Sequence, residues 1–403
     1  MTTLSSLNVM ELFSDAAKTD RAPLSGAAQQ ASVPLTSFSF GLADPTMFPR
    51  EELVDVFAQV MASEGPAALN YGVTHKVLVE QIIERLAHQG VQASPEQILV
   101  TYGSGQLLGL LPRVFVNPGD VVIIEGPTFM GSVRHFQEGG ATLYTVPVDD
   151  EGMDVNALES MLVDLKAQGI RPKFIYTIPT FHNPSGVTMT LERRKRLIEL
   201  ASAYGVLIVE DDAYYDLRFS GEPLPTLASL DPTGSLVLRL CTFSKILAPG
   251  IRVGWAYGHP EIIKRLLQMR SEGNHNPFVT RIVSKFSENG RLDQHIAALN
   301  ERYSYKANLM YEAIKQYFPA DVKVNKPEGG FFIWCKLPSD ISATKLLAEC
   351  EANHGVTFLA GTRCYANGQG DHEVRLSFSF LSPEQITDGI AKIGKAMEIV
   401  RGK

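Results

Sequence analysis

Short apolar runs recur along the first two thirds of the chain, and each ends in glycines or polar residues. Such runs predict buried strands, and the stretches between them carry the apolar spacing of amphipathic helices. Strands that alternate with helices predict an α/β domain whose mostly parallel sheet is covered by helices on both faces. The apolar runs lie at 98–101, 121–125, 173–179, 206–209 and 235–241, and early helical patterns lie at 7–17 and 51–62.

The pattern changes near residue 295. A long helical pattern at 292–317 is followed by three apolar runs that predict further strands, at 322–324, 330–335 and 373–378. We therefore expect a second, smaller α+β domain at 296–403. A large domain would then span 48–295, and residues 1–47 would form an N-terminal segment that joins the small domain near the substrate entrance.

Composition narrows the functional classes. The net charge of -7 argues against nucleic acid as the main partner, because such partners select basic surfaces. The basic cluster at 193–196 follows a possible N-cap, Thr190, and is interpreted as the solvated face of an amphipathic helix. The chain has no apolar run of membrane-spanning length and no signal-peptide pattern. Its four cysteines lack metal-site spacing, so we expect no disulfide, no metal and a cytoplasmic location.

The most informative stretch follows the run at 235–241. It reads TFSKILAPGIR, so Lys245 comes shortly after Thr242 and Ser244. Arg252 lies seven residues beyond the lysine. A buried lysine amine loses basicity and forms Schiff bases with carbonyls, whereas hydroxyls and a guanidinium suit a phosphate. The spacing T-x-S-K-x6-R therefore predicts an amine nucleophile beside an anion site, in preference to a solvated loop lysine.

A second anion-binding pattern follows the run at 98–101. The sequence YGSGQLLG combines a glycine turn with a helix start, where free backbone N–H groups can bind an anion at Ser104 and Gly105. Gly103 and Gly105 also match the start of a dinucleotide fingerprint, but the third glycine, Gly109, falls one residue late. A nicotinamide-binding site is the alternative interpretation of this stretch.

Two further runs end in polar groups. The sequence FHNPSG, which contains Asn183, follows the run at 173–179, and EDDAYY, which contains Asp211 and Tyr214, follows the run at 206–209. Three acids at the end of an apolar strand are costly unless they are paired or exposed. Their purpose could be a metal site, but no histidine lies close to them in the sequence.

The units N-P-S-G, D-D-A-Y and T-F-S-K-x6-R appear in an order and spacing that strongly resemble the pyridoxal-phosphate (PLP) enzymes of fold type I. The likeness is greatest to class I and II aminotransferases of the aminoadipate/kynurenine and valine–pyruvate kind, and it covers almost the whole chain. The resemblance implies a large PLP-binding domain with a seven-stranded sheet, and a smaller α+β domain. It also implies that Lys245 holds PLP as an internal aldimine.

The resemblance assigns roles to individual residues. It implies that Lys245, Asp211 and Tyr214 are catalytic, with Asp211 on the pyridinium N–H and Tyr214 on the phenolic oxygen of the cofactor. Substrate-binding residues would be Gly41, Asn183 and Arg375, the last of these for the α-carboxylate. The predicted cofactor-binding residues are Tyr71, Ser104, Gly105, Phe129, Asn183, Asp211, Tyr214, Thr242, Ser244, Lys245 and Arg252.

Several positions leave alternatives open. Tyr71 matches a tyrosine that reaches the cofactor phosphate of a second subunit, which implies a homodimer with shared sites, but it could be a buried structural tyrosine. Phe129 could stack on the pyridine ring or belong to the core, and Arg375 could face solvent from a strand. Gly41 could be a simple turn glycine. The chain departs from the family pattern at Phe40, Lys76, Gly105 and Phe129.

Together these patterns predict an aminotransferase that moves an amino group between an α-amino acid and a 2-oxo acid. Another PLP reaction on an amino acid, such as decarboxylation, oxidation, elimination or replacement, would use the same scaffold. A nicotinamide-dependent oxidoreductase is a more distant alternative. The substrate side chain is not indicated by the sequence.

Overall fold

The computed structural model describes residue 13 and residues 35–271 and 276–402. The predicted helix at 7–17, apart from Phe13, lies outside these residues, as does the part of the predicted N-terminal segment before residue 35. Among the described residues, no helix combines the length and the apolar character needed to cross a membrane.

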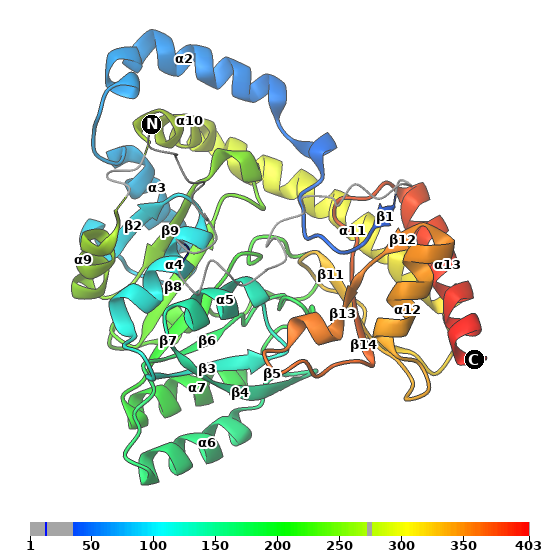
Figure 1. Cartoon of the computed structure of the whole chain (residues 1–403). Coiled ribbons are helices and arrows are strands. Elements are labelled where there is room, and N and C mark those ends of the chain that lie inside the picture. The colour runs from blue at the N-terminus through cyan, green and yellow to red at the C-terminus, as the bar shows by residue number, and fades with distance from the viewer. Residues whose placement is uncertain (1–12, 14–34, 272–275, 403) are drawn as a thin grey trace, which may run out of the picture. The chain divides into compact units, whose positions relative to one another are not determined.

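The larger sheet has eight strands, of which the last is a two-residue hairpin partner (Figure 1). Neighbouring strands pair in parallel through the middle of the sheet, and the strand at 254–257 runs against both of its neighbours. In spatial order the strands are β2 (Ile98–Thr101), β9 (Gly254–Tyr257), β8 (Val237–Thr242), β7 (Leu207–Asp211), β6 (Phe174–Thr177), β3 (Val121–Gly126), β4 (Thr142–Asp149) and β5 (Gly152–Met153).

Helices cover both faces of this sheet. One face packs its apolar side chains against α4 (Ser104–Phe115) and α5 (Met130–Glu138), with a contribution from α9 (Pro260–Met269). The other face packs against α6 (Val155–Ala167) and α7 (Leu191–Tyr204), which lie on the opposite side of the strands from α4 and α5 (Figure 1). The middle strands are buried on both faces, which explains why they form continuous apolar runs.

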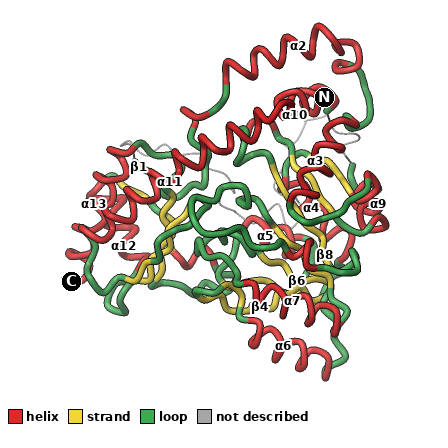
Figure 2. Tube along the Cα trace, turned by 180° about the vertical axis from the view of Figure 1, so that it is seen from behind, coloured by secondary structure: helices red, strands yellow, loops and turns green. Residues whose placement is uncertain are grey.

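Four further helices belong to this part of the described chain. They are α2 (Arg50–Leu69), α3 (Lys76–His88), the short α8 (Leu227–Leu230) and α10 (Pro277–Ser287). Seen from behind, the long α11 (Arg291–Tyr317) runs from α10 toward the C-terminal helix α13 (Pro383–Arg401), and α10 packs beside α2 (Figure 2). This long helix therefore connects the large sheet with the second structural unit.

The second sheet is small and antiparallel. Its strands, in spatial order, are β10 (Lys323–Val324), β11 (Phe332–Lys336), β14 (Glu373–Ser377) and β13 (Leu359–Ala360). Helices α12 (Ala343–Glu349) and α13 pack together near it. A two-stranded parallel pair, β1 (Thr36–Ser37) with β12 (Val356–Thr357), ties the beginning of the described chain to this unit.

The predicted fold class is confirmed: a large, mostly parallel sheet between helices accompanies a smaller antiparallel sheet. The extra strand beyond the predicted seven is the two-residue β5. Sequence reasoning missed β4 and β9. The first is a partly exposed strand that contains Pro147 and has only the two-residue β5 on its outer side, and the second is four residues long and begins at Gly254. Neither provides a continuous apolar run.

The prediction that the basic cluster at 193–196 forms the solvated face of a helix is wrong for one of its residues. Its helix begins after Thr190, whose side chain accepts from the Arg193 backbone N–H as predicted for an N-cap. Arg194 was expected on the solvated face and is instead fully buried, because helical spacing places it beside buried Leu197 and Ile198. Its guanidinium is satisfied by carbonyl oxygens, those of Pro179, Met189 and Pro225.

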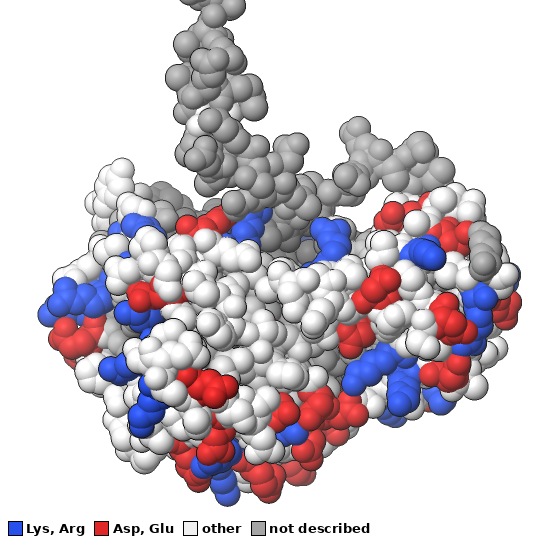
Figure 3. Space-filling view, turned by 60° about the horizontal axis from the view of Figure 1, so that its bottom comes forward, with Lys and Arg blue, Asp and Glu red and all other residues white. Residues whose placement is uncertain are grey.

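The charged side chains visible in Figure 3 are of both signs and are interspersed, and the middle of this face is largely uncharged. A duplex or single strand of nucleic acid would require a stripe of basic side chains. This face therefore does not have the charge distribution of a nucleic-acid interface.

Candidate active site

Lys245 lies in the turn that follows β8, at the carboxyl edge of the sheet where open α/β folds bind ligands. Its Nζ donates to the backbone oxygen of Gly41 at 2.8 Å. The amine is also 5.9 Å from the ring centroid of Tyr214 and 5.5 Å from that of Phe331. The lysine thus points into a space bounded by the glycine segment near residue 41 and by two aromatic rings.

The surroundings of Lys245 make its amine more nucleophilic. Burial, together with the positive charges of Arg375 and Arg252, lowers the pKa of Lys245 to about 8. Asp211 acts in the opposite direction but does not cancel these effects. A lower pKa increases the fraction of neutral amine near neutral pH, and the neutral amine is the form that attacks a carbonyl.

Asp211 is the last residue of β7, and its neighbours in sequence point to the opposite face of the sheet. Its Oδ2 accepts a hydrogen bond of 2.6 Å from the Tyr176 hydroxyl, whereas its buried Oδ1 has no hydrogen-bond partner among the described residues. Burial raises the pKa of Asp211 to about 6, although the Tyr176 hydrogen bond lowers it. An acceptor atom is therefore held free at the edge of the sheet.

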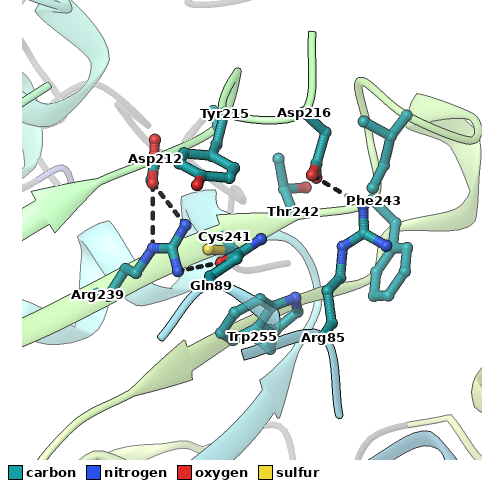
Figure 4. A pocket seen from close by; sticks show the side chains of 12 residues that line it. Arg85, Gln89, Asp212, Tyr215, Asp216, Arg239, Cys241, Thr242, Phe243 and Trp255 are labelled. Carbon is teal, nitrogen blue, oxygen red and sulfur yellow. Dashed lines mark hydrogen bonds and ion pairs between the residues drawn. The ribbon is translucent and has the colours of Figure 1, made fainter. Parts of the chain in front are cut away.

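Glu210 and Asp212 lie on the other face of β7, where Arg239 of β8 neutralises them. The guanidinium donates to Asp212 Oδ2 from Nη2 at 2.7 Å and from Nε at 3.1 Å. Figure 4 shows this arrangement, with Gln89 on the far side of Arg239 and the ring of Tyr215 above it. Alternation along one strand therefore places Glu210 and Asp212 beside Arg239, whereas Asp211 on the other face has no ion-pair partner among the described residues.

The residues predicted for an anion converge at the start of α4. Thr242 Oγ1 donates to Ser244 Oγ at 2.9 Å, and Arg252 Nη1 lies 3.5 Å from the same Ser244 oxygen. A Cβ added at Gly103 would lie 2.7 Å from Arg252 Nη2, so glycine is needed there for the guanidinium to approach. Ser104 follows directly as the first residue of α4.

The second anion-binding feature is the helix start itself. A Cβ added at Gly254 would lie 2.7 Å from the Ser104 backbone nitrogen, which shows how closely α4 approaches β9. A Cβ added at Gly105 would meet nothing within 4 Å, so the first turn of α4 borders open space. The N–H groups at the start of this helix, together with a guanidinium and two hydroxyls, form a cradle suited to a phosphate.

Arg252 adopts a left-handed backbone conformation, with φ 52° and ψ 49°. Such a conformation costs an arginine about 1–3 kcal/mol and persists where surrounding structure requires it. Here it accompanies a guanidinium directed toward Tyr102, whose backbone oxygen accepts from Nη2 at 3.2 Å. The strained backbone is consistent with a side chain placed for binding.

Arg375 extends from β14 of the small sheet into the same region. It is buried, so the alternative of a solvent-facing strand arginine is wrong. Its Nη1 donates to Asn183 Oδ1 at 2.7 Å, and its Nη2 donates to the backbone oxygen of Ser39. The guanidinium lies over the Phe332 ring, and its Nε is buried without a partner among the described residues. The arginine is thus rigidly held and still has a donor free.

Gly41 is needed for close packing and is more than a turn residue. A Cβ at this position would lie 2.5 Å from the Phe332 Cζ and 3.6 Å from the Tyr214 hydroxyl. Tyr214 itself is buried, and its ring packs edge-on against Phe331 and Phe332. The glycine segment, Tyr214 and the two phenylalanines therefore form one side of the space around Lys245.

The side chains of Phe129 and Tyr71 are both exposed, unlike those of core residues. Phe129 precedes α5 and is partly exposed, so the core alternative is wrong. Tyr71 has a fully exposed side chain, which excludes the alternative of a buried structural tyrosine. The structure does not bring Tyr71 to the other predicted residues within this chain.

Comparisons with known proteins agree with this geometry. A family model described as "Aminotransferase class I and II" matches residues 40–393. The chain is 39% identical over 370 residues to aromatic-amino-acid aminotransferase 1 of Thermococcus litoralis, covering 90% of this chain and 88% of that protein. It is 34% identical to 2-aminoadipate transaminase of Thermus thermophilus, covering 90% of each.

This chain belongs to the class I and II aminotransferases.

Solved structures support the same assignment. The Pyrococcus horikoshii kynurenine aminotransferase in complex with PMP matches with a TM-score of 0.91 and 36% identity, covering 97% of this chain and 98% of that one. The α-aminoadipate aminotransferase of Thermus thermophilus, complexed with N-(5'-phosphopyridoxyl)-L-leucine, matches with a TM-score of 0.87 and 34% identity, covering 98% and 99%. The predicted family, the transferase class and the PLP cofactor are confirmed, and the nicotinamide alternative is wrong.

The residues of this aminotransferase fit PLP in chemical character. The free Oδ1 of Asp211 can accept from a ring N–H, the cradle at Ser104 and Arg252 suits the phosphate, and the charges of Asp211 and Arg252 both act on the Lys245 amine. The buried and unpartnered Nε of Arg375 is a donor available to a carboxylate. The donor set therefore matches both a phosphorylated cofactor and an amino acid.

Sequence reasoning missed the polar side chains beneath this aminotransferase site. Tyr176 was included only as part of an apolar strand, although its hydroxyl binds Asp211. His182, to which no role was assigned, is buried with its Nε2 3.1 Å from a Glu125 oxygen and its Nδ1 2.7 Å from the Ser185 hydroxyl. One indication of these contacts was present in the sequence, where Glu125 and Tyr176 are polar residues within largely apolar runs.

The glycine segment is also fixed by a buried ion pair that the sequence did not indicate. Lys306 of α11 donates to Asp44 Oδ2 at 2.6 Å and to the backbone oxygen of Ser379 at 2.8 Å. Ser379 in turn donates to the Leu42 oxygen at 2.6 Å. These bonds attach the segment that covers Lys245 to the small-sheet unit.

Proposed function

We propose that this aminotransferase moves an amino group between an α-amino acid and a 2-oxo acid, with PLP bonded covalently to Lys245 in the resting enzyme. The observation that carries this assignment is the position of the Lys245 amine. It is buried at the carboxyl edge of the sheet and has a pKa lowered to about 8 by burial. The charges of Asp211 and of Arg252, which belongs to the phosphate cradle, both act on this amine.

Each residue would contribute a separate interaction. When bound, PLP withdraws electrons from the bonds of the substrate Cα. Lys245, once released, would take the proton from Cα and return it to the cofactor side as general base and acid. Asp211 would hold the ring N–H, Tyr214 and Asn183 would hydrogen-bond the phenolic oxygen, and Phe129 would stack on the ring.

The phosphate and the substrate would occupy the two ends of the site. Ser104, Gly105, Thr242, Ser244 and Arg252 would bind the phosphate with backbone and side-chain donors. Arg375 would bind the substrate α-carboxylate with a guanidinium that matches its geometry, next to Asn183 and Gly41. These roles rest on the contacts described above and on the resemblance to the family.

Borohydride reduction of the purified protein tests the covalent assignment. We expect the visible absorbance of the bound cofactor to disappear and a single pyridoxyl-modified peptide to contain Lys245. Modification of a different lysine would overturn the assignment. A screen of amino donors and oxo acids, followed through the cofactor spectrum, would then define the side-chain specificity and separate transamination from other PLP reactions.

We also propose a homodimer with shared sites. Apolar side chains exposed on α2 and just after it support a protein interface, since contiguous exposed apolar surface marks interaction sites. They are Val54, Phe57, Leu69 and Val73, and the fully exposed Tyr71 lies among them. Tyr71 would then reach the phosphate cradle of the second subunit.

Mixing two inactive variants tests the shared site. A Lys245→Ala chain and a chain with a disruptive Tyr71 substitution, such as Tyr71→Asp, should regain activity together, because each mixed dimer contains one intact site. A fully active monomer in light scattering would contradict the proposal.

Two broader expectations belong with this proposal. The division at residues 47 and 295 would separate an N-terminal segment, a PLP-binding domain and a small domain that carries Arg375. A cytoplasmic location agrees with four cysteines that are all free and buried thiols. Limited proteolysis would test the division, and fractionation would test the location.

A further inference from the structure

Tyr176 is placed next to Asp211 by the register of two neighbouring parallel strands. Tyr176 of β6 pairs with Val209 of β7, and Asp211 lies two residues further on the same face. The tyrosine hydroxyl therefore reaches the next side chain along and donates to Asp211 Oδ2 at 2.6 Å. Both side chains are buried, so water does not compete for this bond.

We propose that Tyr176 is a positioning residue that fixes the Asp211 carboxylate with one oxygen engaged and the other turned toward the cofactor ring nitrogen. This inference rests on the proposed role of Asp211. The division between the two oxygens supports it, because Oδ2 is hydrogen-bonded and the equally buried Oδ1 has no partner among the described residues. A carboxylate without such an anchor could rotate and lose this orientation.

The ring of Tyr176 is held by ordinary core packing, so the hydroxyl has a separate purpose. The ring packs edge-on against Phe136 of α5, with 5.4 Å between centroids, and Phe136 packs against Phe174 in the same way. A phenylalanine at 176 would keep these contacts. It would lose the hydrogen bond of the hydroxyl to Asp211 and its interaction with the Ser132 side chain.

The charged groups around Asp211 determine how its pKa should respond when the Tyr176 hydroxyl is removed. Burial raises the pKa of Asp211 to about 6, and the Tyr176 hydrogen bond opposes this. Asp212 on the same strand and Glu125 on β3 also raise it, whereas Lys245 lowers it. The remaining titratable group nearby is Tyr214, whose own pKa is raised by burial and, to a smaller extent, by Asp211.

Removal of the hydroxyl should therefore move the titration of Asp211 to higher pH. Hydrogen bonds to an ionised group stabilise the charged form, so Tyr176→Phe should shift the pKa upward by roughly one unit. Binding of the cofactor ring is weakened when the free site takes up this proton. The pH at which PLP affinity declines should consequently rise by the same amount.

Equilibrium dialysis of the full-length holoenzyme at a series of pH values measures this decline. In Tyr176→Phe we expect it to begin roughly one pH unit higher than in wild type, with PLP binding roughly twofold weaker at about pH 7 and roughly tenfold weaker at about pH 5. The titrations of PLP itself are common to all variants and cancel in this comparison. Tyr257→Phe is the matched control, because Tyr257 is a buried tyrosine of the same sheet that pairs with Arg239 at the other end of β8.

A double-mutant cycle with Asp211→Asn separates positioning from general packing. If Tyr176 acts through the carboxylate, Tyr176→Phe should leave the pH dependence of PLP affinity unchanged in the Asp211→Asn background. An equal shift in that background, an equal shift in Tyr257→Phe, or no shift in folded Tyr176→Phe would overturn the inference. Failure of wild-type protein to bind PLP would instead contradict the proposed function.

Discussion

At the end of β7, the two faces of the sheet carry buried carboxylates in different electrostatic environments. The carboxylates of one face are paired with an arginine, and the carboxylate of the other face is not. On one face, Glu210 and Asp212 are neutralised by Arg239, and the backbone N–H groups of Leu227 and Ala228 bind Glu210. On the other face, Asp211 has one hydrogen bond and one free oxygen. Lys245, a cation whose charge acts on Asp211, donates to a backbone oxygen.

The difference shows how one strand serves both stability and function. Buried carboxylates that are paired with a guanidinium are held in place, and breaking such a pair is costly. Buried groups left open retain binding capacity and have shifted pKa values, as Asp211 and Lys245 do. The open face should therefore respond to mutation mainly in chemistry, and the closed face mainly in stability.

The largest expected effect is that of Lys245→Ala on turnover. Loss of the amine removes both the covalent attachment and the proton transfer, so kcat should fall by about four orders of magnitude, as measured with any accepted amino donor. PLP should still bind noncovalently. The matched control is Lys306→Met: this buried lysine is paired with Asp44 at 2.6 Å, so its loss should lower Tm instead. Near-normal turnover in Lys245→Ala would refute the division between the regions.

The closed face is tested by Arg239→Gln. This change leaves buried Glu210 and Asp212 without their counterion, so the free energy of unfolding should decrease by about 3–5 kcal/mol in urea denaturation. Arg196→Gln is the control, since Arg196 pairs with Glu159 and Glu199 at the surface and should contribute at most about 1 kcal/mol. Equal losses in the two variants would contradict the comparison.

On the face that carries Asp211, we expect the opposite change in stability. In protein freed of PLP, Asp211→Asn should be more stable than wild type. The folded pKa of about 6 lies above the ordinary value of 3.8, so ionisation costs stability as pH rises between these values. Removing the charge should stabilise the protein by roughly 2–3 kcal/mol above this range, while turnover falls. The gain should vanish below it, where the aspartate is protonated in both states. A gain that persists in acid would show that the charge is not its cause.

The smallest expected effect is that of Tyr71→Phe. If Tyr71 donates to the phosphate of a neighbouring subunit, its loss should weaken PLP retention by about 1.5–3 kcal/mol, measured by dialysis of the holoenzyme. Chain folding should be unchanged because the side chain is fully exposed in the single chain. Unchanged PLP retention would remove Tyr71 from the cofactor site.

Much of the architecture and of the candidate site could be predicted from local patterns. The runs that became β2, β3 and β8 are strongly apolar because these strands are buried on both faces. The short units around Asn183, Asp211 and Lys245 indicated the family because their chemistry is concentrated within a few residues. Arg252 and Arg375 were identified in the same way.

Other features are long-range and left little trace in the sequence. Strand β9 was missed because its pairing with β2 and β8 makes it a strand, and four residues give no clear period. Arg194 was placed in solvent because a run of basic residues usually is, whereas the oxygens that bind it come from three separate segments.

The sequence by itself determined the order of strands and helices and the residue types that meet a phosphorylated cofactor and an amino acid. Only the tertiary structure decided which of the acids at 210–212 pair with a guanidinium, because that depends on strand register and on the position of Arg239 across the sheet. It also decided that Tyr176 binds Asp211 and that Lys306 binds Asp44. Hydrogen bonds and desolvation depend on distance in space, and residues 35 or 262 positions apart become neighbours only when the chain folds.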